Sequence, residues 1–213
     1  MWQLNNPQPV KLIIGILAAN ETALAAAVKA ISKSFGVIDL TSDIWPFTQT
    51  DYYKDELGSN ALRQFVTIEK PIDPGKLAKI KHTTNKLEQK LAEKLKVFNA
   101  ADVIASEAKQ SQSFDTNRLP RRPDEPGLLA MTPLPRPVNL DPGFIEPSKL
   151  ILASTKNFSH RIYIGNKMFA EVTLMYEKGR WRHFEYTFPD YRQSCYQDFL
   201  SKVRTRLLEQ LKT

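Results

Sequence analysis

The sequence of 213 residues predicts an α+β fold, a single domain in which helices pack on a mixed or antiparallel sheet. Three observations favour this class. The first half alternates short apolar runs with amphipathic helical segments, and the second half contains several short strands separated by turn residues. A C-terminal β-meander is followed by a final helical pattern. The composition, 42% hydrophobic and 25% charged, is that of a globular protein with a sizeable core.

The first predicted elements are a buried strand and the helix that follows it. Residues 10–19 form a short, apolar, β-branched run, which is typical of a buried strand. Asn20 is a suitable N-cap for a helix that runs to Phe35, and Gly36 provides the C-terminal stop. Residues 37–44 predict a second strand.

A third strand and a long helix complete the first half. The strand is predicted at residues 61–69, and the sequence Asp73-Pro74-Gly75 opens the helix. Apolar residues recur along one stripe of this helix, with Lys and Glu opposite: Leu77, Ile80, Thr84, Leu87, Leu91 and Leu95. The order β-α-β-β-α indicates a sheet with helices packed on it.

An insert at residues 100–133 separates two core segments, 10–99 and 134–211. It lacks a sustained hydrophobic period and is rich in Ser, Gln, Pro and charge, so we expect it to be disorder-prone. Residues 103–112 resemble the peptide encoded by a bacterial interspersed DNA repeat, which implies an incidental insertion at a surface loop. The insert has four basic and five acidic residues and therefore a net charge of −1. Because the whole chain has a net charge of +7, the rest of the chain carries +8.

The second half begins with two further strands. Residues 135–143 predict a strand that leads into a turn at Asp141-Pro142-Gly143. Residues 149–155 predict the next strand, and residues 193–211 predict the closing helix.

The meander between them is predicted from strands at residues 161–164, 168–176 and 181–188, with turns at Gly165-Asn166 and residues 177–179. A three-residue loop at the second turn gives the register that favours burial. It places these apolar side chains on one face: Ala170, Val172, Leu174, Phe184, Tyr186 and Phe188. The opposite face is either the solvent side of the sheet or the floor of a site: Glu171, Thr173, His183, Glu185 and Thr187.

Charge, cysteine content and the length of apolar runs indicate which partners and which cellular location to expect. With 30 basic and 23 acidic residues, the net charge of +7 suits an anionic ligand, but the basic residues are spread along the chain and do not favour nucleic acid. The lone Cys195 fits a cytoplasmic location. The longest apolar run, residues 12–19, is much shorter than the roughly 20 residues of a membrane span, and no secretory signal is evident. The oligomeric state is not indicated.

Common catalytic and cofactor motifs are absent from the sequence. It contains no GxxxxGK[ST], GxGxxG, HExxH, CxxC or GxSxG pattern, so no cofactor is identified. Three histidines and one cysteine disfavour a His/Cys metal site, and no metal ligands are assigned, although a carboxylate-bound magnesium site stays open.

Three polar stretches are the candidate sites. They are residues 50–58, 136–143 and 154–161, and their candidate ligand-binding residues are Tyr53, Arg136, Asn139, Asp141, Thr155, Lys156, Asn157 and Arg161. Arg offers bidentate contacts to phosphate or carboxylate, and Lys offers a point charge. His160 is a candidate catalytic acid or base if Glu171 orients it. Alternatively, each stretch is structural: a plain turn, the start of a loop or a surface group.

The same stretches carry a family resemblance. The chain resembles a bacterial family known as domain of unknown function 4416. The resemblance rests on residues 51–53 with 56–58, on Lys81 with residues 84–85 and Glu88, and on these later segments: 138–143, 155–158 with 160–163, 170–174 and 186–191. It implies that the polar stretches are a signature of the family, that no activity is established for it, and that the insert departs from its pattern.

The leading functional hypothesis is therefore a cytoplasmic protein that binds a phosphorylated or carboxylated small molecule such as a nucleotide, with or without converting it. The alternative is an RNA- or protein-binding module without catalysis. A third interpretation is a structural subunit whose polar motifs hold its own loops.

Overall fold

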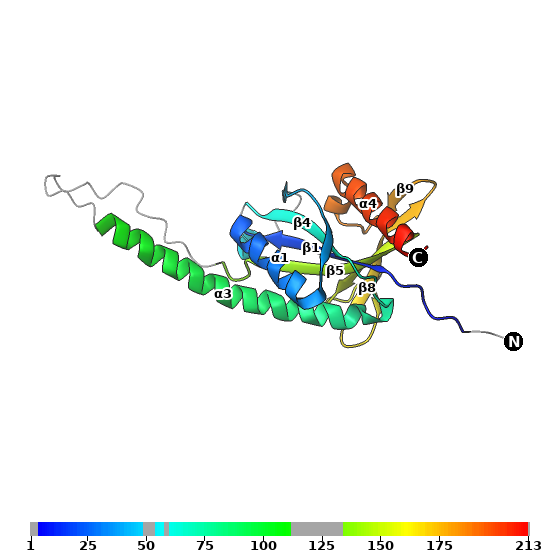
Figure 1. The fold of residues 1–213 in the computed structure, drawn as a ribbon, viewed down its shortest axis with the longest axis horizontal. Helices are drawn as coiled ribbons and strands as arrows, with labels where there is room; N and C mark the ends of the chain where they lie inside the picture. The colour runs from blue at the N-terminus through cyan, green and yellow to red at the C-terminus, as the bar shows by residue number, and fades with distance from the viewer. Residues whose placement is uncertain (1–3, 49–53, 58–59, 112–133, 213) are drawn as a thin grey trace.

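The structure is a computed structural model that describes residues 4–48, 54–57, 60–111 and 134–212. In this described part, nine strands form one antiparallel sheet, which confirms the predicted α+β class (Figure 1). The strand order is β2-β4-β1-β5-β6-β8-β7, with β3 paired to β4 and β9 paired to β8.

The strands are β1 (Lys11–Ala18), β2 (Ile38–Thr41), β3 (Trp45–Pro46), β4 (Leu62–Ile68), β5 (Val138–Glu146), β6 (Lys149–Ser154), β7 (Ile162–Tyr163), β8 (Phe169–Glu177) and β9 (Arg180–His183). The α-helices are α1 (Glu21–Phe35), α2 (Lys54–Leu57), α3 (Leu77–Ser111) and α4 (Ser194–Gln210). The predicted meander and closing helix are present at the C-terminal end.

Helices cover both faces of the sheet. Because successive side chains of a strand point to opposite faces, β1 presents two apolar sets, and both are buried. Leu12, Ile14 and Ile16 pack with residues of α1 and α3 on one face. Ile13 packs on the other face, in a cluster that contains Phe65 and the apolar residues of α4. The central strand therefore lies inside the core on both sides.

Both predicted ends of α1 are confirmed. The side chain of Asn20 accepts a hydrogen bond from the backbone N–H of Ala23 at 2.9 Å, which satisfies a donor that the helix leaves open. Gly36 adopts a φ of 108°, a conformation that favours glycine, and its N–H donates to the carbonyl of Ser32.

The long helix extends further than the sequence predicted. α3 continues to Ser111, so residues 100–111 of the expected insert are helical, contrary to the prediction that the insert lacks regular structure from residue 100. Four of these twelve residues are Ala, the strongest helix former, and the chain has no Gly or Pro between residue 100 and Pro120. The rest of the insert, residues 112–133, lies outside the described residues.

The predicted turn at residues 141–143 is wrong. Strand β5 continues through Pro142 to Glu146 and pairs with β1, with Asp141 opposite Gly15. Local turn chemistry favours Asp-Pro-Gly as a turn, but pairing with two buried strands overrides it. Gly143 is required for a different reason, because a Cβ there would lie 2.2 Å from the carbonyl oxygen of Ile151.

The predicted register of the last hairpin is also wrong. β8 and β9 are joined by two residues, Lys178 and Gly179, with φ of 50° and 80°. Positive φ at both positions is the geometry of a tight two-residue hairpin turn. β9 ends at His183, so residues 184–188 never pair with β8 and the burial argument for the other register does not apply.

The remaining predicted strands appear close to their expected positions, including β1, β4, β6 and β7. Among the described helices, none is long and apolar enough to cross a membrane.

Candidate functional site

The candidate site lies where β5 and β6 separate. The two strands pair from Gly143 opposite Leu152 to Glu146 opposite Lys149. The next residue of β5 toward its start is Pro142, which has no N–H to continue the ladder. β6 therefore leaves β5 beyond this point, and the preceding half of β5 has an open edge.

Side chains from α3 satisfy this open edge. The backbone N–H of Leu140 donates to Glu88 Oε1 at 2.8 Å, and the carbonyl of Leu140 accepts from Lys81 Nζ at 2.9 Å. The stripe residue Thr84 between them is fully buried. The helix thus supplies the hydrogen bonds that a neighbouring strand would otherwise make.

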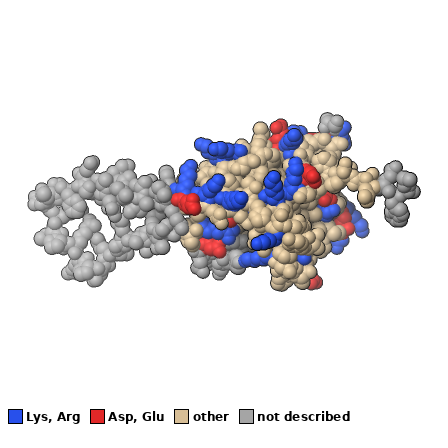
Figure 2. Space-filling model, turned by 90° about the horizontal axis from the view of Figure 1, so that it is seen from below, with Lys and Arg blue, Asp and Glu red and all other residues tan. Residues whose placement is uncertain are grey.

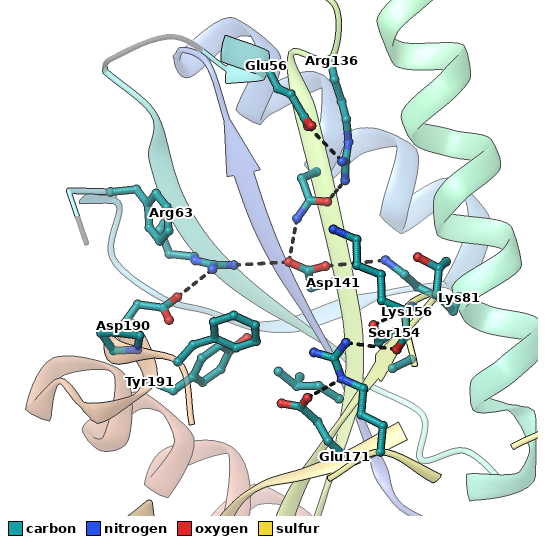
Figure 3. A pocket seen from close by; sticks show the side chains of 18 residues that line it. Glu56, Arg63, Lys81, Arg136, Asp141, Ser154, Lys156, Glu171, Asp190 and Tyr191 are labelled. Atoms are coloured by element: carbon teal, nitrogen blue, oxygen red, sulfur yellow. Dashed lines mark hydrogen bonds and ion pairs between the residues drawn. The ribbon is translucent and has the colours of Figure 1, made fainter. Parts of the chain in front are cut away.

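The opening forms a pocket of about 690 Å³, a volume typical of small-molecule sites. Its walls come from β4, β5, the end of β6, β8, α3 and residues 188–191 (Figure 3). Five basic side chains line it: Arg63, Lys81, Arg136, Lys156 and Arg161. Four acidic side chains accompany them: Glu56, Asp141, Glu171 and Asp190.

Asp141 stands at the centre of the polar groups (Figure 3). Its Oδ2 accepts from Asn139 Nδ2 at 2.6 Å and lies 4.0 Å from Arg63 Nη1, and its Oδ1 lies 3.5 Å from Lys81 Nζ. Two cations and one amide therefore hold the carboxylate on the sheet. About a quarter of its side chain stays exposed to the pocket.

Arg136 connects Glu56 of α2 to Glu88 of α3. It donates to Glu56 at 3.0 Å and to the side-chain oxygen of Asn139, and it lies 3.1 Å from Glu88 Oε2. Burial raises the pKa of Glu88 above its usual range, and this effect outweighs the opposite influence of Lys81 and Arg136.

Arg63 forms the deep wall. Its Nη2 donates to Asp190 at 2.8 Å, and the rings of Phe47, Phe65 and Tyr191 lie 5.2, 5.4 and 5.9 Å from the guanidinium carbon. Burial raises the pKa of Asp190, although Arg63 opposes this shift.

A glycine makes room for the guanidinium. A Cβ at Gly15 would lie 2.9 Å from Arg63 Nη1 and 3.1 Å from a ring carbon of Phe65. The absence of a side chain on β1 at this point is therefore what lets Arg63 lie flat on the sheet.

The third polar stretch is organised around Glu171, which β8 buries. Glu171 Oε2 accepts from Arg161 Nε at 2.8 Å and lies 3.1 Å from His160 Nε2, while Oε1 accepts from the hydroxyl of Thr173. Arg161 also donates to the carbonyl of Lys156 at 3.0 Å. The imidazole of His160 stacks on Tyr186, with 4.1 Å between ring centroids.

The residues of the polar face predicted for the meander do not share one environment. Glu171 and Thr173 are buried with Thr187, and Glu171 lines the pocket, whereas His183 and Glu185 are exposed. Thr187 reaches this position from the turn after β9, where its hydroxyl donates to the carbonyl of Thr173 at 2.7 Å.

The structure brings most of the predicted site residues into the pocket lining: Arg136, Asn139, Asp141, Thr155, Lys156, Arg161 and Glu171. His160 touches Glu171 but, with Asn157, is not part of the lining. Tyr53 lies outside the described residues. No group of three or more His, Cys, Asp or Glu residues in the described part is arranged to hold a metal ion.

Sequence reasoning missed Arg63 entirely. The available signal was a charged residue inside a predicted strand whose other residues are mostly apolar, at a position where the side chain must be buried and paired. Lys81, Glu88, Asp190 and Tyr191 were indicated only by the family resemblance, because the residues that they contact come from distant parts of the chain. Glu56 lies in the first polar stretch, at residues 50–58.

Comparison with models of protein families identifies the family of this chain. The sequence model of Domain of unknown function (DUF4416) matches residues 8–100 and 128–207, which is well over half of the chain. The protein belongs to this DUF4416 family. No curated protein and no solved structure matches the chain significantly.

All residues that line the pocket lie within the two segments matched to DUF4416. The interruption between residues 100 and 128 coincides with the outer part of α3 and the residues that follow it. The pocket is therefore built entirely from the part of the chain that the DUF4416 family describes.

Proposed function

We propose that this protein binds a small molecule that carries a phosphate or carboxylate group, such as a nucleotide, in the pocket between β5 and β6. The observation that supports this most strongly is that basic side chains from distant parts of the sequence meet in one pocket. Five basic side chains from β4, α3 and the segments around β5 and β6 line one pocket of about 690 Å³. Against four acidic side chains they leave a net charge of +1 (5 − 4).

The anionic group of the ligand is expected at the end of β6. Among the described residues that line the pocket there, Lys156 and Arg161 are basic and Glu171 is acidic. Arg161 is fixed in place by Glu171 and by the carbonyl of Lys156, which reduces the entropy lost on binding.

The geometry supports binding more directly than conversion. Glu171 already accepts from Arg161 and Thr173 and contacts His160, so both of its carboxylate oxygens are engaged by protein groups. His160 lies behind Glu171, stacked on Tyr186. A catalytic role for the His160–Glu171 pair remains a prediction that requires the imidazole to reach the ligand. We place the protein in the cytoplasm, in keeping with its lone Cys195.

A thermal-shift and isothermal titration screen with nucleoside phosphates and sugar phosphates tests the proposal. A compound at a hundredfold its Kd should stabilise the fold by about 2.7 kcal/mol. Lys156→Ala should weaken binding, whereas Lys202→Ala, an exposed lysine of α4, should leave it unchanged. The proposal fails if none of the compounds stabilises the protein.

The alternative function is RNA binding without catalysis, and one surface favours it. Phe158, Ile162 and Tyr163 expose 64%, 69% and 62% of their area at the β7 edge of the sheet, and exposed aromatic side chains can stack on unpaired bases. However, Lys and Arg are dispersed over the face shown in Figure 2 and form no continuous basic patch there. RNA binding would weaken steeply with salt, and pocket binding would not.

A further inference from the structure

Two buried polar groups in the pocket lack hydrogen-bond partners. Arg63 and Tyr191 each expose only 3% of their surface. Arg63 Nε and Nη1 and the Tyr191 hydroxyl make no hydrogen bond within the part of the chain that the structure describes. Leaving such groups unsatisfied costs about 1–3 kcal/mol each, so their persistence side by side requires an explanation.

Both residues line the pocket, so their unpaired groups lie beside the space that a ligand would fill. Figure 3 shows the guanidinium of Arg63 directed toward Asp141, with Asp190 and Tyr191 below it. Burial raises the pKa of Tyr191 well above its usual value of 10, so the phenol keeps its proton at neutral pH. The arginine and the phenol therefore both present hydrogen-bond donors, and the missing partner is an acceptor.

The local charge decides what kind of acceptor fits. Arg63 and Lys81 are balanced by Asp141 and Asp190, which gives a net charge of zero at this end (2 − 2). Asp190 lies 2.8 Å from one guanidinium nitrogen, and Asp141 lies 4.0 Å from another. A phosphate here would face two carboxylates, whereas a carbonyl oxygen would accept the same hydrogen bonds without that repulsion.

The apolar walls at this end add a constraint on shape. Phe47 and Tyr191 lie against Arg63, and Phe188 also lines the pocket. Aromatic walls favour a flat, weakly polar group. We infer that Arg63 and Tyr191 bind the carbonyl oxygen of a planar ring, in the same ligand whose anionic group is bound near Lys156. This inference rests on the proposed function, and it selects nucleotides with a carbonyl-bearing base over sugar phosphates.

Matched probes separate the two ends of the ligand. Uridine, cytidine and guanosine 5′-monophosphates are each compared with ribose 5-phosphate by isothermal titration, because the pairs share the phosphate and the sugar. At least one nucleotide is expected to bind tenfold or more tightly than ribose 5-phosphate. Tyr191→Phe should reduce this advantage by about tenfold, the effect of one lost hydrogen bond, and leave ribose 5-phosphate unchanged.

Two further variants serve as controls. Lys156→Ala should weaken nucleotides and ribose 5-phosphate equally, and Tyr176→Phe, which lies outside the pocket lining, should change neither. Tyr191→Phe is preferred to a change at Arg63, because removing the arginine would leave Asp190 buried without its partner.

The outcomes distinguish the two proposals. If nucleotides and ribose 5-phosphate bind wild-type protein equally, the inference about the ring is wrong while the anion site stands. If Tyr191→Phe weakens ribose 5-phosphate as much as the nucleotides, the phosphate lies at Tyr191 and the inference is overturned. If no probe binds, the proposed function itself fails.

Discussion

Lys11 and Arg63 are both buried cations, but their surroundings differ. Lys11 is fully buried, and its ammonium donates to Asp39 at 2.5 Å, to the carbonyl of Glu69 at 3.0 Å and to Gln210 at 3.0 Å. An ammonium has three donors, so all of them are used. Arg63 keeps two nitrogens, Nε and Nη1, without a hydrogen-bond partner in the described chain. The satisfied cation joins β1 to β2 and α4, and the unsatisfied one faces a pocket.

The Lys11 contact predicts acid sensitivity. Burial opposes ionisation of Asp39, but hydrogen bonds from Lys11 and Thr67 outweigh it and lower the pKa of Asp39 below 3.8. The folded state therefore releases this proton more readily than the unfolded state, so the contribution to stability is present above pH 3.8 and is lost as pH falls through the folded pKa. Urea unfolding as a function of pH should show this loss, and Asp39→Asn should remove it.

Replacing the lysine gives a second test of the same contact. Lys11→Met should cost about 3 kcal/mol in the free energy of unfolding, because Asp39 loses a buried partner. Lys29→Met, at an exposed position of α1, should change stability by less than about 0.5 kcal/mol. Equal effects of the two substitutions would contradict the assignment.

At the scale of elements, the separation of β5 from β6 positions the site. Gly143 marks the last close approach of the two backbones, and Pro142 marks the point where pairing stops. Two adjacent residues thus define both the tightest contact in this part of the sheet and the opening beside it.

The close approach predicts an unequal cost for two glycine substitutions. Gly143→Ala should destabilise the fold by about 3 kcal/mol, because its Cβ would meet the backbone of Ile151, which cannot move without displacing β6. Gly15→Ala should cost less, because its nearest atoms belong to the side chains of Arg63 and Phe65, at 2.9 and 3.1 Å, and not to the backbone. Denaturant unfolding of the two variants measures the difference, and the reverse order would refute the explanation.

Local patterns in the sequence were sufficient for some elements and insufficient for others. Asn20 and Gly36 determine the ends of α1 by contacts within a few residues, so sequence alone predicts them. Pro142 is different, because its role depends on β1 and β6, which are distant in sequence. The register of β8 and β9 depends on where the chain leaves the sheet after His183, which no local period encodes.

In the candidate site too, local sequence predicts some residues and does not predict others. Arg136, Asn139 and Asp141 were recognisable as a polar stretch because they are neighbours in the chain. The role of Arg63 depends on its contacts with Asp190 and Asp141, which lie 127 and 78 residues away in the sequence. Composition and spacing do not reveal such a pairing.

At the scale of the whole molecule, α3 extends beyond the rest of the described fold (Figure 1). Side-chain burial is described for α3 as far as Leu95, and the buried residues in this part, from Leu77 to Leu95, pack on the sheet and α1. The segment skipped by the family match begins at residue 101. The stabilising contacts described for α3 therefore lie before the interruption.

Removing residues 102–132 should leave a folded core. The shortened chain must return from α3 to Arg136, and unwinding the six residues after Leu95 would provide about 20 Å of extended chain. We expect a cooperative thermal transition and a loss of helical circular dichroism that exceeds the deleted residues. A second variant with a flexible linker of about 12 residues in place of the deleted segment tests chain reach. Failure of both variants to fold would show that the segment is structural.

The hydrogen bonds that α3 makes to Leu140 connect this projecting helix to the pocket. Lys81 and Glu88 are seven residues apart, two helical turns, and they hold the carbonyl and the N–H of the same residue. Sliding or rotating the helix would break both bonds and displace Asp141, which Lys81 also contacts. Because both bonds come from one helix, the position of α3 along β5 sets the position of Asp141 in the pocket.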